Sequence, residues 1–298
     1  MKIYFHIILY LFLICNSVLA DFSFIVFGDW GKGGRYFQTD VGSQMAEWSE
    51  KNNAKFIIST GDNFYNDGVQ STEDSSWTLS FENIYWQQSL FIPWYVTLGN
   101  HDYHGIVQAQ IDYSKMSNRW NMPSRYYSQT FLVDDSTTAL FVFLDTSPLA
   151  LSDPEAKKFT ENVFKFDNKV QLRWLDSILS SSKAQWKFVS GHHPVYSGGY
   201  HGGQIEMQKL IKPILEKNNV QAYFCGHDHD MQYLKSGKIN YIVSGAGAKP
   251  RVCEDTEFTY FYMGGTAGFF AATLTSKKLY GAFIDSEGNQ LYKLAFGR

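Results

Sequence analysis

The sequence has few cysteines and no excess of positive charge. Cys15 lies in an N-terminal segment that we expect to be removed, which leaves Cys225 and Cys253. These two could pair in an oxidising compartment, but they cannot build a disulfide-rich framework. The chain has 29 Asp and Glu residues and 26 Lys and Arg residues. A faintly acidic chain has no electrostatic reason to coat nucleic acid or an anionic membrane, so we expect no nucleic-acid partner.

Long hydrophobic runs are missing as well, except near the N-terminus. There Lys2 precedes an apolar run over residues 7–14, and small residues up to Ala20 suit a signal peptidase. The run is short for a membrane anchor, which needs about 20 residues. We therefore predict that residues 1–20 are a signal peptide and that the chain is not stably inserted in a membrane once they are removed. The protein would then be secreted or lie in the lumen of the secretory or endolysosomal pathway. We also expect a monomer.

What the chain does have is apolar and aromatic residues in short runs. Hydrophobic residues make up 44% and aromatic residues 17% of it, which indicates a globular protein with buried strands. Short apolar runs bounded by glycine predict strands at residues 24–27, 56–59, 94–97, 188–190 and 222–224. Apolar residues at helical spacing predict helices at residues 36–52, 169–182 and 205–218.

The C-terminal part is richer in strands. Residues 241–244, 269–274, 279–285 and 291–296 fit this pattern, and we interpret them as a second sheet. No linker, repeat or low-complexity tract separates them from the rest. We predict one domain over residues 21–298, of the α/β class with α+β layering, in which two packed mixed β-sheets are flanked by helices.

Polar residues gather where the predicted strands end. Five runs follow in order along the chain: GDWG, GDNFY, GNHD, GHHPVYS and GHDHD. A single Gly-Asp is usually only a turn. Five such ends are a stronger signal, because all seven histidines of residues 21–298 lie in or near them. Carboxylate and imidazole suit first-row metals, and His227 and His229, one residue apart, could address two neighbouring ions.

These five runs resemble the calcineurin-like metallophosphoesterases. Most of that superfamily has a histidine two residues after the first aspartate, where this chain has Gly31. Tyr65 follows Asp62 by three residues instead, which is the pattern of the purple acid phosphatases. The chain is similar to their small, tartrate-resistant form. The resemblance implies a four-layer metallophosphoesterase sandwich and an acid phosphatase.

The resemblance also implies a role for each motif residue. Ferric iron would be bound by Asp29, Tyr65 and His229, with Asp62 as the bridge and Asn100, His192 and His227 on a second, divalent ion of iron, zinc or manganese. His101 and His201 would contact the phosphate and protonate the leaving oxygen. The binuclear Fe(III)–M(II) centre would activate hydroxide to attack a phosphate-ester substrate, a phosphomonoester. One departure from the family is Tyr200, where a glutamate commonly precedes the second outer histidine.

Two alternatives remain open at this point. A metallophosphodiesterase acting on nucleotide or lipid esters would use the same two-ion chemistry. A non-catalytic relative would keep the fold as a binding scaffold, and it would be expected to have lost some ligands, of which this sequence has lost none.

Overall fold

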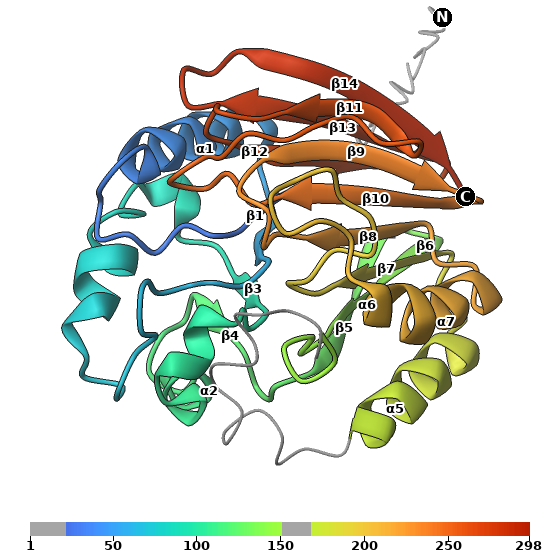
Figure 1. Cartoon of the computed structure of the whole chain (residues 1–298), viewed down its shortest axis with the longest axis horizontal. Coiled ribbons are helices and arrows are strands. Elements are labelled where there is room, and N and C mark those ends of the chain that lie inside the picture. The colour runs from blue at the N-terminus through green and yellow to red at the C-terminus, as the bar shows by residue number, and fades with distance from the viewer. Residues whose placement is uncertain (1–21, 151–167) are drawn as a thin grey trace, which may run out of the picture.

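Two sheets and their flanking helices form the protein in a computed structural model, which describes residues 22–150 and 168–298 (Figure 1). The predicted signal peptide lies outside this part of the chain. Within it, no helix is both long and apolar enough to cross a bilayer.

The first sheet has seven strands in the order β14-β13-β12-β1-β2-β3-β4. Its strands are β1 (Phe22–Phe27), β2 (Phe56–Ser59), β3 (Trp94–Val96), β4 (Trp120–Asn121), β12 (Gly268–Leu274), β13 (Lys278–Asp285) and β14 (Gln290–Gly297). From β1 to β4 neighbouring strands are parallel, whereas β12 to β14 pair antiparallel.

The second sheet also has seven strands, in the order β11-β9-β10-β8-β7-β6-β5. They are β5 (Tyr127–Asp134), β6 (Thr137–Phe143), β7 (Trp186–Ser190), β8 (Ala222–Cys225), β9 (Met231–Ser236), β10 (Ile239–Ser244) and β11 (Thr259–Met263). In this sheet β6 pairs parallel with β7, β7 with β8, and β8 with β10.

Helices cover the outer faces of both sheets. They are α1 (Gln38–Asn52), α2 (Val107–Tyr113), α5 (Asn168–Ser181), α6 (Ile205–Leu210) and α7 (Lys212–Lys217), with the short turns η1 (Trp77–Glu82), η2 (Gln88–Leu90) and η3 (His101–His104). Figure 1 shows α5, α6 and α7 together on one side of the strands and α1 on the other. Leu175 and Leu179 of α5 pack with Val189 of β7 in one apolar cluster.

The space between the sheets is filled largely by aromatic rings. The ring of Phe24 in β1 lies 5.3 Å from that of Phe141 in β6 and 6.0 Å from that of Phe224 in β8. All three side chains are buried, and together with the outer helices this core gives the four layers helix, sheet, sheet, helix. The predicted fold class is therefore confirmed, and the high aromatic content is explained by burial between the sheets.

The assignment of strands to sheets was wrong in one respect. The three strands β12, β13 and β14 do not form a second sheet; they extend the first, because β12 pairs antiparallel with β1 with Phe22 opposite Leu274. Of these four C-terminal strands, only the one at residues 241–244, which is part of β10, lies in the second sheet, where it joins the predicted strands at residues 188–190 and 222–224, parts of β7 and β8. Periodicity in the sequence indicates a strand but not its partner.

The predicted helix at residues 205–218 is also interrupted. It forms two short helices, α6 and α7, and Pro213 lies in the first turn of the second. Proline has no amide hydrogen to continue a helix and favours a first turn, so a new helix begins there. The helices predicted at residues 36–52 and 169–182 correspond to α1 and α5.

Candidate metal centre

The loops that follow the parallel strands of both sheets meet in one place. Asp29 follows β1, Asp62 follows β2, and His227 follows β8. Each of the three has a left-handed backbone, with φ of 60°, 51° and 70° respectively. A non-glycine residue in this region costs about 1–2 kcal/mol, and such strain concentrates at functional sites. The strand ends thus turn sharply and direct these side chains toward one another.

A first donor set consists of Asp29, Asp62, Tyr65 and His229. The Tyr65 hydroxyl oxygen lies 3.0 Å from Asp29 Oδ1, 2.7 Å from Asp62 Oδ2 and 3.1 Å from His229 Nε2. Ligand atoms of Asp29, Asp62 and His229 all lie within 4.8 Å of one another, and all three residues are buried. One ion could touch all four side chains.

A second donor set consists of Asp62, Asn100, His192 and His227. His192 Nε2 lies 3.0 Å from Asn100 Oδ1 and 3.5 Å from Asp62 Oδ1. His227 Nδ1 lies 3.1 Å from both Asn100 Oδ1 and His192 Nε2. Because Asp62 belongs to both sets and offers one oxygen to each, it lies between the places that two ions could occupy.

Backbone carbonyls fix how two of the imidazoles face these sets. His192 Nδ1 donates to the carbonyl oxygen of Thr60 at 2.9 Å, and His229 Nδ1 donates to that of Lys249 at 2.9 Å. A carbonyl oxygen only accepts, so the proton of each ring is on Nδ1. The lone pair on Nε2 is then free to bind a metal, as is usual for histidine ligands with an outer hydrogen-bond partner.

A buried carboxylate that the sequence interpretation did not single out ties the loops together. Asp102, the last residue of GNHD, accepts hydrogen bonds from the backbone N–H of Gly99 at 2.8 Å and of Asn63 at 3.1 Å. These amides lie beside Asn100 and Asp62. Burial, followed by the nearby Asp62 charge, raises the pKa of Asp102 to about 7. Its position in the motif was the only sequence signal.

Burial controls the electrostatics of the centre. Burial and then the neighbouring Asp62 raise the pKa of Asp29, and burial and then Asp29 raise the pKa of Tyr65. Burial lowers the pKa of His192 to about 4 and of His229 to about 3, so both imidazoles are neutral. Burial thus disfavours the charged form of these groups, and a bound cation would favour the anionic form of the acids and use the free lone pairs of the neutral imidazoles, which the donor chemistry of both sets also fits.

Close packing explains why Gly31 stands where the superfamily commonly has a histidine. A Cβ atom on Gly31 would lie 1.9 Å from the Asn63 carbonyl oxygen and 2.7 Å from Phe64 Cα. In addition, the Tyr65 amide donates to the Gly31 carbonyl at 2.9 Å. The backbone that carries Tyr65 therefore occupies the space that a histidine side chain would need.

The two outer histidines lie on either side of the donor sets. The ring centroid of His101 is 4.4 Å from that of Tyr65, and its backbone N–H donates to Asp62 Oδ1 at 2.9 Å. The ring centroid of His201 is 4.2 Å from that of His227. The site pocket, with a volume of about 400 Å³, is lined by Asp62, Asn100, His101, Tyr200, His201, His227, His229 and Arg251.

Two cations at the centre escaped the sequence interpretation. Lys32 is mostly buried, and its Nζ lies 3.0 Å from the centre of the Tyr65 ring. Burial lowers its pKa to about 8. Arg251 Nη1 lies 3.1 Å from His201 Nε2. No motif marks either residue; only the loop after Asp29 hinted at Lys32.

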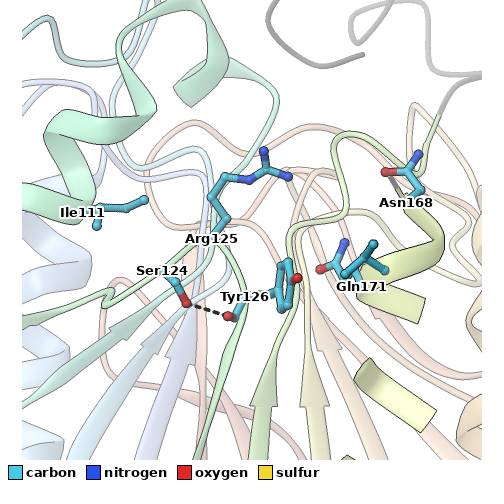
Figure 2. A pocket seen from close by; sticks show the side chains of 7 residues that line it. Ile111, Ser124, Arg125, Tyr126, Asn168 and Gln171 are labelled. Carbon is cyan, nitrogen blue, oxygen red and sulfur yellow. Dashed lines mark hydrogen bonds between the residues drawn. The ribbon is translucent and has the colours of Figure 1, made fainter. Parts of the chain in front are cut away.

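A separate pocket of about 520 Å³ lies between α2 and α5 and contains none of the predicted metal ligands. Figure 2 shows Arg125 among its lining side chains. Arg125 Nε lies 3.0 Å from Oδ2 of the fully buried Asp145, so the guanidinium serves an internal ion pair. The two remaining cysteines are also outside the centre: both Cys225 and Cys253 are unpaired thiols.

Comparison with known proteins agrees with this geometry. A sequence model of the calcineurin-like phosphoesterase family matches residues 22–231. Purple acid phosphatase 4 of Arabidopsis thaliana is 38% identical over 291 residues, covering 92% of this chain and 83% of its own. Tartrate-resistant acid phosphatase type 5 of Rattus norvegicus is 34% identical over 304 residues, covering 95% and 93%.

Among solved structures, that of "GAP50 the anchor in the inner membrane complex of Plasmodium" is similar with a TM-score of 0.80 and 26% identity, over 93% of this chain and 89% of that one. The extent and identity of the matches to the two phosphatases go well beyond a shared fold. The chain therefore belongs to the purple acid phosphatases, acid phosphatases within the calcineurin-like phosphoesterase family.

Proposed function

We propose that this protein hydrolyses phosphomonoesters at a binuclear centre of ferric iron and a divalent ion. The observation that carries the proposal is the pair of donor sets joined by one carboxylate, with Tyr65 in the first set and Asn100 in the second. A single-ion site would have no use for the second cluster of buried donors.

The chemistry of the donors supports a division between two different ions. Phenolate and carboxylate are hard, anionic donors, so Tyr65 and Asp29, with His229, would suit a trivalent ion. Amide and imidazole are neutral, so Asn100, His192 and His227 would suit a divalent ion of iron, zinc or manganese. Asp62 would bridge them. The relatives with the same pattern are purple acid phosphatases.

When bound, two such ions supply charge neutralisation for the phosphate and a water of lowered pKa as nucleophile. The chain itself would do the rest. His101 and His201 flank the donor sets and would orient the phosphate oxygens. Arg251 donates only, so the His201 Nε2 that it contacts must accept in the absence of substrate. His201 could act as a proton donor to the leaving oxygen only after that contact is released.

We also propose that residues 1–20 direct the chain into the secretory pathway and are removed, leaving residues 21–298 as one catalytic domain. Family membership supports both, since the match to the rat phosphatase extends over nearly the whole chain. N-terminal sequencing of the secreted protein would test the first point. A start before residue 21 would contradict it.

The decisive experiment combines activity, metal analysis and the visible spectrum. The metal-loaded protein should hydrolyse p-nitrophenyl phosphate at mildly acidic pH, resist tartrate, and be purple to pink from phenolate bound to ferric iron. Tyr65→Phe should remove the colour and keep the fold, since it removes only one oxygen. Tyr280→Phe, an exposed tyrosine on β13, is the control and should keep the colour.

Each failure would have a definite meaning. A metal-loaded protein with the colour but no turnover of any phosphate ester would be a non-catalytic scaffold. Faster turnover of bis-p-nitrophenyl phosphate than of the monoester would indicate a phosphodiesterase. A Tyr65→Phe variant that keeps the visible band would overturn the iron assignment.

A further inference from the structure

The loop after β1 holds Lys32 beside the first donor set through hydrogen bonds to buried side chains. The N–H groups of Lys32 and Gly34 both donate to Gln38 Oε1, at 3.0 Å and 2.9 Å. Between them, the Gly33 N–H donates to Ser80 Oγ at 3.0 Å. Gln38 is fully buried, and its Nε2 donates to the Ser80 carbonyl at 2.7 Å. Three consecutive amides are therefore bound, and the backbone of Lys32 has a fixed place.

The Lys32 side chain directs its charge at the ring of Tyr65. Its Nζ lies 3.0 Å from the centre of that ring, and Lys32 is only 9% exposed. Among the residues that the structure describes, no carboxylate forms an ion pair with this ammonium. The ring is thus its close partner, and the nearby carboxylates of Asp29 and Asp62 attract it from further away.

The contact changes in kind once Tyr65 binds a metal. Over a neutral tyrosine it is a cation–π interaction. A phenolate carries a negative charge that is spread over the ring, so the attraction becomes one between two opposite charges. Because Lys32 and Tyr65 are largely shielded from water, this attraction is weakly screened. The neighbouring Lys249 does not share the role, since its Nζ lies over another ring, that of Tyr36, at 4.9 Å.

We infer that Lys32 is a positioning residue that acts through Tyr65, and that its charge lowers the energy of the phenolate electrons and so weakens their donation to ferric iron. This inference rests on the proposed function and adds a residue to the same centre. Groups that contact a metal ligand from outside are known to tune the metal in this way. The visible band arises when an electron moves from the phenolate to ferric iron, so Lys32 should keep that band at shorter wavelength.

The geometry decides the sign of the effect. The ammonium lies 3.0 Å from the ring centre, whereas it forms no ion pair with Asp29 or Asp62, whose oxygens would hold the ion. Electrostatic energy falls with distance, so the charge stabilises the electrons of the ring more than it lowers the orbitals that accept them. The weaker donation also leaves the ferric ion poorer in electrons, and it should then be easier to reduce.

The test compares visible spectra of the metal-loaded wild type and of Lys32→Met, which keeps the length of the side chain and removes its charge. The band should move to longer wavelength by on the order of 10–30 nm. Lys32→Arg keeps the charge and should stay near the wild type. Lys51→Met, the same change at an exposed site in the last turn of α1, should leave the band in place. Iron content is measured in every sample.

A redox titration followed by the same band gives a second readout. Iron should be harder to reduce in Lys32→Met than in the wild type, and Lys32→Arg should restore the wild-type behaviour. Lys32→Gln, a polar neutral variant, should act as Lys32→Met does and guards against an effect of the apolar side chain alone.

Several results would overturn the role of Lys32. An unmoved band in an iron-loaded neutral variant is one, and an equal shift in Lys32→Arg is another, because packing rather than charge would then be responsible. Neutral variants that fold by circular dichroism but hold no iron would assign Lys32 to binding the ion instead. A wild type with ferric iron but no visible band refutes the iron assignment of the proposed function and this inference with it, whereas a coloured wild type with an unmoved variant band refutes this inference alone.

Discussion

Replacing Gly31 by alanine should disturb the metal centre without touching any metal ligand. The new Cβ would lie 1.9 Å from the Asn63 carbonyl oxygen, whereas ordinary contact begins near 3.4 Å. The backbone at Asn63 would have to move by about 1.5 Å to restore contact distance. It cannot move freely, because the Asn63 side chain donates to the Thr97 carbonyl at 2.9 Å and the Asn63 backbone is bound by Asp102.

The expected cost follows from these contacts. Overpacking of this kind costs about 1–3 kcal/mol. Loss of the hydrogen bond from Tyr65 N–H to the Gly31 carbonyl adds about 1 kcal/mol. At about 2–4 °C per kcal/mol for a protein of this size, the sum of about 2–4 kcal/mol should lower Tm by about 4–16 °C. Since Asp62 and Tyr65 lie on either side of the displaced backbone, the variant should also hold less iron and show a weakened visible band.

The control lies in the same loop. Gly33 has φ of +65°, and a Cβ there would meet nothing nearer than Ser80 Oγ at 4.0 Å. Gly33→Ala should therefore cost only the strain of a left-handed alanine, about 1–2 kcal/mol, with the spectrum unchanged. Calorimetry, metal analysis and absorption spectra measure all three effects. If Gly31→Ala matches Gly33→Ala in Tm and keeps its full visible band, the close approach of the two loops does not position Tyr65.

Three further predictions test other parts of the structure. Asn100→Ala and His192→Ala should each release the divalent ion before iron, as metal analysis during mild chelation will show; loss of iron first would reverse the division of ligands. Phe24→Ala should reduce the free energy of unfolding by about 3–5 kcal/mol, measured by urea denaturation, with the ratio of the two metals unchanged. In the metal-free protein, His192 has its pKa lowered to about 4, so the unfolded chain binds this proton more readily. Its contribution to stability is complete above the ordinary pKa near 6.5 and is lost at up to about 1.4 kcal/mol per pH unit as the pH falls toward 4. Urea denaturation at several pH values should accordingly give a smaller loss for His192→Gln than for the wild type, and an equal loss would contradict the buried, neutral imidazole.

The sequence by itself was sufficient to indicate which residues meet at the centre. The donors stand in the loops that follow short apolar runs, and the carboxyl ends of parallel strands meet at one edge of a sheet. Asp29 and Asp62 follow the parallel pair β1 and β2, so a local pattern already placed them together. The fold class was likewise available, because strand and helix periodicities are properties of neighbouring residues.

Which strands pair was decided only by the tertiary structure. β1 pairs with β12 through residues about 250 positions apart in the chain, such as Ser23 and Thr273. No local periodicity carries that information, so the C-terminal strands were assigned to the wrong sheet. The break between α6 and α7 was within reach of the sequence, since Pro213 marks it.

The surroundings of the centre also required the folded structure. Arg251 and His201 are 50 residues apart in the chain, yet their side chains touch. The space around Gly31 is taken by Asn63, whose backbone arrives from the next strand. A sequence motif can indicate residues that lie together after one strand, because local backbone geometry fixes their positions relative to one another. Side chains that arrive from distant loops depend on how the sheets and loops pack, and that packing determines the charge beside His201 and the close approach that excludes a side chain at Gly31.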